Sequence, residues 1–298
     1  MPYSVVLHTE PPSEALFSTD ALRRAWQEVR RNGQAAGIDR MTMAQFGQHL
    51  DGELSKLRAE VLEGTYRPQK ALRFYKVKPS GKKRPLVLWA VRDRVLQRTV
   101  HDFLTSVLEP LFLDCSFGFR PGRNVTDAVE VVRQSLTDKK QWIVDADIRD
   151  CFDSIPAPLM LAQVRGVIHS AIVIQLIDQW LHTPIVGDPR ALTGVSQGNV
   201  LSPQLTNLYL HRFDEMVSAA LPGTQLVRFA DDFVILCSRK VEAQWALVAA
   251  RHALATLRLQ LNAEKTRVLH ADEGFTFLGT AFRGTEICQS STSKNKVQ

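Results

Sequence analysis

Three aspartates stand in stretches that otherwise predict buried strands. Asp231 and Asp232 are adjacent within the apolar stretch RFADDFVILC, residues 228–237, and Asp147 lies near the end of QWIVDADI. Like charges this close repel, and burying a carboxylate is costly unless a cation lies beside it. If neighbouring antiparallel strands bring the three together, they can hold hard divalent cations such as Mg²⁺, which activate an attacking hydroxyl and stabilise a departing pyrophosphate. The alternative for the Asp–Asp pair by itself is a solvated turn.

The elements that must position these acids predict an α+β fold, with a small antiparallel sheet backed by helices. Alternation along WIVDADIRD places Asp145 and Asp147 on one strand face, and residues 224–238 predict a strand, a tight turn and a second strand. Two more strands are predicted at residues 72–77 and 85–89, joined by a polar loop. Apolar residues at helical spacing predict helices within residues 18–33, 43–64, 92–112, 124–136, 161–181, 201–221 and 242–261.

Composition and charge limit the kind of protein without identifying it. The 298 residues, 45% of them hydrophobic, suffice for one large domain or two interleaved subdomains. A formal net charge of +6 favours a polyanionic partner. The four cysteines lie far apart without paired spacing, so we expect small buried hydrophobic residues and neither a zinc site nor disulfides. No stretch reaches the ~18 apolar residues that span a bilayer, so we expect a cytoplasmic protein that does not enter a membrane.

A series of motifs follows a single order along residues 32–282. The motifs are NGQAAGIDRMT, TYRPQKALRFYKVKPSGKKRPLVLWAVRDRVLQRTV, SFGFRPGRNVTDAV, DADIRDCFDSI, GVSQGNVLSPQLTNLYL, RFADDFVILC, LRLQLNAEKTRV and FTFLGTAF. In this order they resemble the successive blocks of a group II intron-type reverse transcriptase. The resemblance implies a right-hand polymerase with fingers and palm, which copies an RNA template into DNA from a DNA or RNA primer. It also implies dNTP substrates and two Mg²⁺ ions, with Mn²⁺ as a substitute.

The resemblance assigns the catalytic and metal-binding positions. It makes Asp147 the first metal ligand and Asp231 the second, with Asp232 completing the pair. These three aspartates are the predicted catalytic residues, and they are the same acids that charge repulsion singles out. Ile148 is expected to contribute at most a backbone carbonyl to the metal.

The resemblance also implies a binding site for the incoming nucleotide. Phe152 matches an aromatic residue beneath the sugar, where its ring would collide with a ribose 2′-hydroxyl; the alternative is core packing. Lys265 matches a lysine near the triphosphate that can donate a proton to pyrophosphate, and the alternative is a surface salt bridge. The basic hairpin around Arg84 suits phosphate oxygens, although charge runs are often only solvated. The predicted nucleotide-binding residues are Lys78, Arg84, Phe152, Gln197, Gly198 and Lys265.

Contacts with template and primer are predicted in two other motifs. Arg120 and Arg123 in FGFRPGRN match positions that contact the template or the nucleotide. Phe229 replaces the tyrosine of the Tyr-Ala-Asp-Asp box that is usual in the family, a change that spares both metal ligands. We therefore assign these three residues to template and primer binding.

The resemblance predicts how the chain is divided. Residues 1–20 are expected to form a flexible segment and residues 21–140 the N-terminal helices and fingers. Residues 141–283 are expected to form the palm, with a helical insertion at residues 157–190. Residues 284–298 form a C-terminal stub, so the thumb that grips the duplex in group II intron enzymes is expected to be largely missing. Either a partner protein supplies that function or the chain is a piece of a longer fusion.

Finer similarities predict the pathway. DIRDCFDSI, FADDFVILC and the short C-terminal stub resemble reverse transcriptases of CRISPR adaptation, which predicts cDNA synthesis for spacer acquisition with Cas1–Cas2. Group II intron mobility and phage defence are the alternatives within the family. Two other classes stay open: an RNA-dependent RNA polymerase, against which Phe152 argues, and a nucleic-acid-binding assembly subunit without turnover. The intact set of acids argues against the second of these.

Overall fold

The structure is a computed structural model in which the chain divides into two compact units, each built from two segments. The first unit comprises Met1–Leu111 and Phe152–Leu208, and the second comprises Phe112–Cys151 and Tyr209–Gln298. This division differs from the expected one, because residues 112–140 pack with the second unit. The structure describes residues 11–33, 35–77, 81, 83–187, 195 and 198–288.

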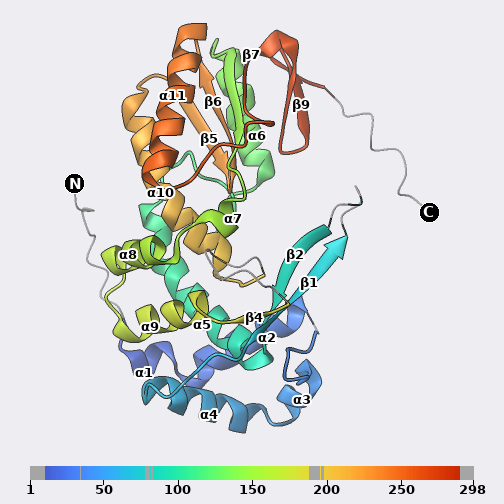
Figure 1. The fold of residues 1–298 in the computed structure, drawn as a ribbon, viewed down its shortest axis with the longest axis vertical. Helices are drawn as coiled ribbons and strands as arrows, with labels where there is room; N and C mark the ends of the chain where they lie inside the picture. Colours follow the sequence, from blue (N-terminus) through green and yellow to red (C-terminus); the bar gives the residue numbers. More distant parts are fainter. Residues whose placement is uncertain are drawn as a thin grey trace. The chain divides into compact units, whose positions relative to one another are not determined.

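The first unit is mainly helical (Figure 1). Its helices are α1 (Ser13–Leu16), α2 (Thr19–Asn32), α3 (Met43–Gln48), α4 (Leu50–Leu62), α5 (Val91–Leu108), α8 (Ala157–Val167) and α9 (Ala171–Leu181), with the 3₁₀ turn η1 (Glu109–Leu111). Ser18 caps α2 by accepting a backbone N–H hydrogen bond, as its residue type predicts. The single helices expected at residues 43–64 and 161–181 are each broken into two, because His49 and Ile168 adopt backbone angles outside the helical region.

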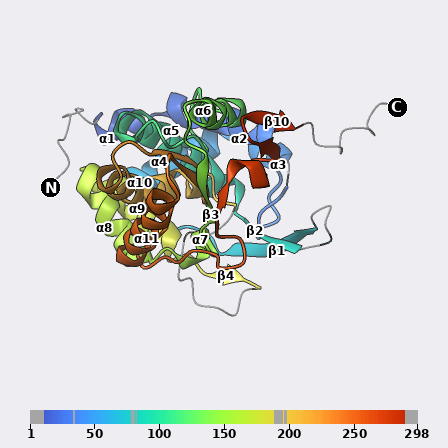
Figure 2. The same ribbon diagram turned by 90° about the horizontal axis from the view of Figure 1, so that it is seen from above.

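The predicted basic hairpin is present in the first unit. Its strands β1 (Ala71–Val77) and β2 (Lys83–Leu88) are antiparallel, and β4 (Ile185–Val186) pairs with β1 in parallel (Figure 2). The register of the two strands sets Lys76 opposite Arg84. Most of the polar loop, residues 78–80 and 82, lies outside the described residues.

The second unit is built on a four-stranded antiparallel sheet with the strand order β5-β6-β3-β7. The strands are β3 (Trp142–Asp147), β5 (Gln225–Phe229), β6 (Asp232–Cys237) and β7 (Arg267–His270). β5 and β6 form the predicted hairpin, and its turn consists of Ala230 and Asp231. β3 pairs with β6 on one side and with β7 on the other, so three separate motifs meet in this sheet.

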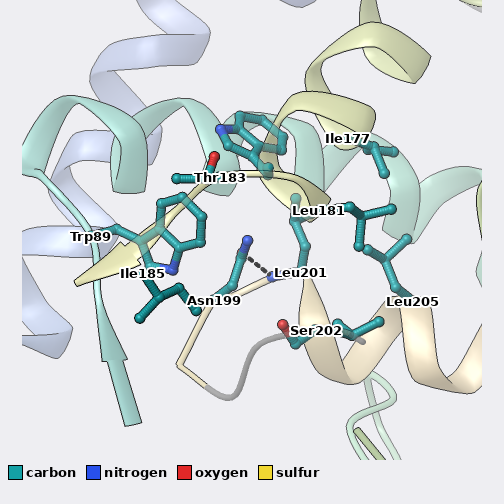
Figure 3. A pocket seen from close by; sticks show the side chains of 11 residues that line it. Trp89, Ile177, Leu181, Thr183, Ile185, Asn199, Leu201, Ser202 and Leu205 are labelled. Atoms are coloured by element: carbon teal, nitrogen blue, oxygen red, sulfur yellow. Dashed lines mark hydrogen bonds between the residues drawn. The ribbon is translucent and has the colours of Figure 1, made fainter. Parts of the chain in front are cut away.

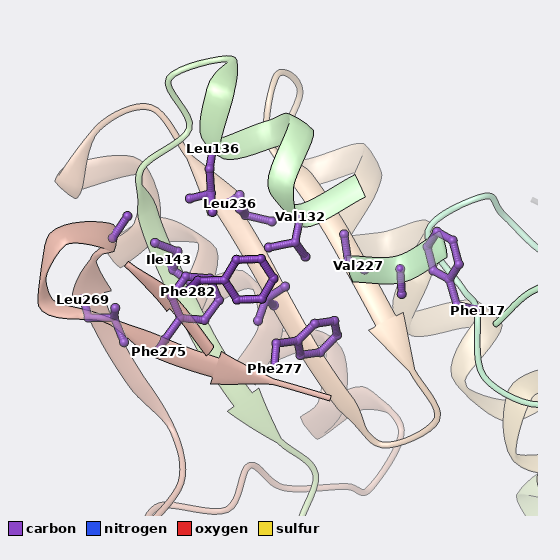
Figure 4. Close-up of a cluster of buried hydrophobic side chains, with 13 residues drawn as sticks. Phe117, Val132, Leu136, Ile143, Val227, Leu236, Leu269, Phe275, Phe277 and Phe282 are labelled. Carbon is purple, nitrogen blue, oxygen red and sulfur yellow. The ribbon is translucent and has the colours of Figure 1, made fainter. Parts of the chain in front are cut away.

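Alternation directs the side chains of this sheet into two separate cores. On one face, Ile143, Val227 and Leu236 pack with Val132 of α6 (Val125–Thr137) (Figure 4). The same core contains the phenylalanines of a second antiparallel sheet, which follows the 3₁₀ turn η2 (Ala271–Glu273). The strands of that second sheet are β8 (Phe275–Phe277), β9 (Thr280–Arg283) and β10 (Glu286–Cys288).

Two helices cover the opposite face of the four-stranded sheet. The helices are α10 (Ser202–Ala220) and α11 (Lys240–Thr256), and the short α7 (Cys151–Ser154) follows β3 in the chain. Phe213 of α10 packs against Phe233 of β6, with their ring centroids 5.0 Å apart. The buried residues of α11 are mostly alanines, and this small-residue side lies along β3 and β6 (Figure 1).

The predicted α+β class, with a small antiparallel sheet backed by helices, is confirmed. Strands β7 to β10 lie in a region for which the sequence gives no strand prediction, because each is only three or four residues long. Three cysteines are buried as expected, whereas Cys288 is exposed at the edge strand β10. In the described part of the chain, no helix has both the length and the apolar character that crossing a membrane requires.

A glycine lets one loop pack directly against the β5–β6 hairpin. The Phe117 N–H donates to the carbonyl of Arg228 at 2.8 Å, which ties this loop to the edge of β5. A Cβ atom on Gly118 would lie 2.6 Å from the backbone nitrogen of Ala230 and 3.1 Å from the carbonyl carbon of Phe229. Because backbone atoms cannot turn aside as a flexible side chain does, a larger residue at 118 must displace the hairpin.

Gly118→Ala should therefore lower the free energy of unfolding by about 1–3 kcal/mol, the usual cost of overpacking. Gly52→Ala is the matched control, because its added Cβ meets nothing within 4 Å on helix α4, where alanine is favoured. Urea unfolding followed by circular dichroism measures both variants. Equal stability of Gly118→Ala and the unchanged protein would contradict the close approach.

Candidate active site

The structure brings Asp147, Asp231 and Asp232 together at one end of the sheet. Asp147 of β3 stands directly opposite Asp232 of β6 in the antiparallel register, which places their Cβ atoms about 5 Å apart. The next residue along β3, Ile148, donates its N–H to the carbonyl of Asp231 at 3.0 Å. The three acids that the sequence singles out are therefore neighbours.

A lysine from a third segment lies against these acids. The Lys265 ammonium is 2.6 Å from Asp147 Oδ2. The backbone that carries the lysine is tied to β3, because the Asn262 N–H donates to the Asp147 carbonyl at 2.8 Å. The hydrogen bond with Asp147 raises the pKa of Lys265. A salt bridge was the alternative given for Lys265, but its partner, Asp147, was not predicted.

A fourth aspartate, Asp145, faces the same way and was not among the predicted site residues. It stands opposite Arg267 of β7, whose guanidinium donates to Asp145 Oδ2 at 2.9 Å. Burial raises the pKa of Asp145, and Arg267 opposes that shift. The signal for Asp145 was present in the sequence, since alternation places it on the same strand face as Asp147.

Asp232 is half-buried among these other carboxylates. Burial, followed by repulsion from Asp145, Asp147 and Asp231, raises its pKa to about 7, and Lys265 opposes this shift. A carboxyl that titrates near neutral pH marks a surplus of negative charge at this end of the sheet. A bound cation would remove that surplus.

The residues of the cluster fit a hard divalent cation in donor type and in charge. Mg²⁺ prefers carboxylate oxygens, and the raised pKa of Asp232 reflects charge that a cation would neutralise. Among the residues that the structure describes, no three His, Cys, Asp or Glu side chains are arranged to hold a metal ion. The ammonium group of Lys265 is the cation that lies beside Asp147 in this structure.

The residues predicted to bind template or primer also lie in the second unit. Arg120 is buried, and its guanidinium donates to two backbone carbonyls of its own loop at 2.7 and 2.8 Å. Arg123 donates to the carbonyl of Asp114 at 2.8 Å and forms an ion pair with its carboxylate. The ring of Phe229 lies 6.3 Å from the exposed ring of Phe119. Both arginines thus stabilise the loop that precedes α6, and their contact with nucleic acid stays a prediction.

Apart from Lys265, the predicted nucleotide-binding residues belong to the first unit. Arg84 lies in β2. A Cβ atom on Gly198 would lie 2.4 Å from the carbonyl oxygen of Val87, and the φ of Gly198 is +112°, so this position requires glycine. Lys78 and Gln197 lie outside the described residues.

Two hollows of the first unit adjoin the segment that contains Gly198. A cavity of about 330 Å³ is lined by Gly198, by Phe74 and Val87 of the hairpin, and by other residues of α2 and α5. Figure 3 shows a smaller, mostly apolar pocket in which Asn199 accepts a hydrogen bond from the Leu201 N–H at 2.9 Å. This bond fixes the backbone between Gly198 and the start of α10.

Phe152, the predicted sugar-selecting residue, is half-buried in α7. Its carbonyl accepts a hydrogen bond from the Val195 N–H at 2.9 Å. The backbone of Phe152 is thereby tied to the segment that leads toward Gly198. Its part in sugar selection stays a prediction.

Known proteins resemble this chain over most of its length. Residues 76–282 match the family described as "Reverse transcriptase (RNA-dependent DNA polymerase)". Protein YkfC of Escherichia coli (strain K12) is 31% identical, with 84% of this chain and 76% of YkfC covered. Group II intron-encoded protein LtrA of Lactococcus lactis subsp. cremoris is 26% identical, with 90% of this chain and 56% of LtrA covered. A solved structure of a partial Cas6-RT-Cas1--Cas2 complex aligns with a TM-score of 0.49 and 23% identity, over 82% of this chain and 41% of that one.

Removing a neighbouring negative charge and removing a neighbouring positive charge should shift the pKa of Asp232 in opposite directions. Asp145→Asn removes a repelling charge and should lower the pKa of Asp232 below about 7, whereas Lys265→Ala removes an attracting charge and should raise it. Carbon-13 NMR of the labelled carboxyl in metal-free protein measures the titration. Asp150→Asn, at an exposed turn, is the control that should leave it unchanged. If the pKa of Asp232 is unchanged in both Asp145→Asn and Lys265→Ala, these residues are not electrostatically coupled to Asp232.

Proposed function

Because the chain belongs to the reverse transcriptase (RNA-dependent DNA polymerase) family, we propose that it extends a primer 3′-hydroxyl with deoxynucleotides on an RNA template. The proposal rests on one observation above all: Asp147 lies opposite Asp232 and beside Asp231, with Lys265 against them. An acidic cluster of this kind suits transfer of a nucleotidyl group, which needs cations held at the reacting phosphate.

Two Mg²⁺ ions are the proposed cofactor, and Mn²⁺ is a substitute. Asp147, Asp231 and Asp232 would hold them through carboxylate oxygens, with at most a backbone carbonyl from Ile148. When bound, the ions lower the pKa of the attacking hydroxyl and stabilise the departing pyrophosphate. The pKa of Asp232, which burial and then repulsion from the neighbouring carboxylates raise to about 7, supports this assignment.

Lys265 has two roles in this proposal. Without metal, its ammonium neutralises Asp147. During the reaction, the same ammonium would balance charge on the departing pyrophosphate or donate a proton to it. Its pKa is raised by the bond to Asp147, so the group is protonated at neutral pH, as a proton donor requires.

Residues of the first unit would bind the incoming nucleotide. Arg84 and Lys78 of the basic hairpin would contact the triphosphate, and Gln197 and Gly198 would border the nascent base pair. The cavity of about 330 Å³ beside Gly198 supports this assignment, because it leaves room next to a backbone without a side chain. Phe152 would lie beneath the sugar and exclude the ribose 2′-hydroxyl.

Template and primer would contact the second unit at Arg120, Arg123 and Phe229. Phe229, together with the exposed Phe119, offers aromatic faces on which bases can stack. Arg123 and Arg120 would attract the phosphate backbone, with their guanidinium groups held by the loop that precedes α6.

For the pathway, we propose synthesis of cDNA for CRISPR spacer acquisition with Cas1–Cas2. The motifs DIRDCFDSI and FADDFVILC support this placement. Group II intron mobility is the alternative that the 26% identity with LtrA favours. Primer extension on an RNA template, with and without a purified Cas1–Cas2 complex, tests the pathway. Extension that Cas1–Cas2 neither stimulates nor joins to an integration product would argue for the alternative.

Asp231→Ala combined with Asp232→Ala should reduce primer extension by about a thousandfold or more, because the cations lose two of their ligands. The readout is the rate of dNTP incorporation on an RNA template at saturating Mg²⁺. RNA binding and the circular dichroism spectrum should stay unchanged.

Asp150→Asn is the matched control for the double variant. Asp150 has a positive φ of 44°, which asparagine also tolerates, so this change removes one nearby charge without straining the turn. It should leave the extension rate within about twofold of the unchanged protein. Full activity in the doubly substituted protein would refute the assignment of the acids.

Phe152→Ala should admit ribonucleotides, because it removes the ring that collides with the 2′-hydroxyl. The ratio of kcat/KM for dNTP over NTP should fall by about tenfold or more. The same assay on the unchanged protein separates a DNA polymerase from an RNA polymerase. An unaltered preference in a folded Phe152→Ala variant would assign the residue to core packing.

A further inference from the structure

Arg228 is a fully buried arginine on the reverse side of the acidic cluster. It is 0% exposed and stands opposite Phe233 in the β5–β6 register. Alternation therefore directs its side chain to the sheet face opposite to that of Asp147 and Asp232. A buried guanidinium must be fully paired, because an unpaired charge in the interior is strongly destabilising.

Two buried side chains accept hydrogen bonds from this guanidinium. Asp214 of α10, itself 0% exposed, accepts hydrogen bonds from Arg228 Nε at 2.7 Å and Nη2 at 2.6 Å. Ser116 Oγ accepts a further bond from Nη2 at 2.8 Å. A guanidinium bound along one edge by a carboxylate is fixed in both position and plane.

The remaining nitrogen of the guanidinium reaches the turn that carries Asp231. Arg228 Nη1 donates to the carbonyl oxygen of Ala230 at 3.0 Å. Ala230 has a φ of +60° at the first position of a two-residue hairpin turn, where glycine is usual. A residue with a side chain stays in this left-handed conformation, at a cost of about 1–2 kcal/mol, only where its surroundings fix it.

Asp231 is thereby held at both of its peptide groups. The carbonyl of the preceding peptide binds Arg228, and the carbonyl of the following peptide accepts the Ile148 N–H at 3.0 Å. Ile148 is the residue directly after Asp147. The two hydrogen bonds together therefore set the direction in which the carboxylate of Asp231 leaves the backbone, relative to Asp147.

We infer that Arg228 is a positioning residue for the acidic cluster: its guanidinium fixes the Ala230–Asp231 peptide and, through it, the carboxylate of Asp231. Apolar residues of similar volume often replace a buried ion pair without loss of stability. The bond from Nη1 to Ala230 completes the pairing of the guanidinium, and it also ties that guanidinium to the turn that carries Asp231. The inference rests on the proposed function, in which Asp231 and Asp232 hold the metal.

Arg228→Lys tests this role, because lysine keeps a positive charge for Asp214 but has no second arm for Ala230. We expect the affinity for Mn²⁺, measured by electron paramagnetic resonance on the folded protein, to fall by about tenfold or more. The kcat for extension should fall similarly, with little change in KM for dNTP. Val132→Ala is the matched control: it shortens a buried side chain in the α6 core of the same unit, so stability falls while Mn²⁺ affinity stays unchanged.

If Arg228→Lys does not fold, a second variant tests the same positioning role. Arg228→Met with Asp214→Leu removes both charges and keeps the core apolar, so the fold should persist. The same losses of Mn²⁺ affinity and kcat are expected, even at an unchanged free energy of unfolding. Affinity and kcat at the level of the unchanged protein, in either folded variant, overturn the inference. Failure of both variants to fold assigns Arg228 to stability alone and overturns it as well.

The same measurements separate this inference from the proposed function. If Asp231→Ala with Asp232→Ala loses Mn²⁺ binding and extension while Arg228→Lys keeps both, only the positioning role is refuted. If the acidic double variant still extends the primer, the assignment of the acids is refuted, and the positioning role with it. If the unchanged protein extends no primer on an RNA template while Arg228→Lys still lowers its Mn²⁺ affinity, the proposed function is refuted and the positioning role stands.

Discussion

The antiparallel pairing of β3 with β6 sets Asp147 directly opposite Asp232, and the rest of the site depends on this repulsive contact. Like charges across a strand pair destabilise a sheet. Burial, together with repulsion from Asp145, Asp147 and Asp231, raises the pKa of Asp232 to about 7. The chain offsets this repulsion with cations from β7 and the turn before it. Lys265 binds Asp147, and Arg267 binds the fourth acid, Asp145. The acids also lie at the end of the strands, where they are only half-buried and solvent reduces the repulsion further.

The two faces of this one sheet have opposite electrostatic character. The face that carries the acids continues into an apolar core beneath α6 and the sheet of β8 to β10 (Figure 4). The reverse face buries the ion pair of Arg228 with Asp214, against α10. Five consecutive residues, 228–232, supply the buried cation, the strained turn and two of the acids. The hairpin therefore contains two of the acids and the arginine that binds their turn, and a loop packs closely against this hairpin at Gly118.

Local patterns were enough to predict much of this fold. Alternation and turn residues identify β3 and the β5–β6 hairpin, and helical spacing of apolar residues identifies α2 and α6. These features depend on a few neighbouring residues. The ion pairs of Lys265 and Arg267 could not be predicted, because they depend on the register of β7 against a strand far earlier in the chain.

The same limit applies to Arg120, whose basic character suggests a ligand contact. Its two backbone carbonyl partners appear only once the loop has folded around it. The contact of Arg120 with nucleic acid stays a prediction, and the structure adds that its guanidinium binds the loop. The helix breaks at His49 and Ile168 could not be predicted either. The helical spacing of apolar residues continues through both positions, although the backbone there leaves the helical conformation.

The second unit is made of two segments, and the chain between them belongs to the first unit. Its central strand, β3, is therefore synthesised well before either of its neighbours, β6 and β7. Pairing between such distant segments is slow, because a long loop must close before any contact stabilises it. On the ribosome, β3 emerges with apolar residues on both faces and no partner. A nascent chain thus carries Asp147 without Asp232 while the residues between them are added, and the acidic cluster assembles only after the β5–β6 hairpin has been synthesised.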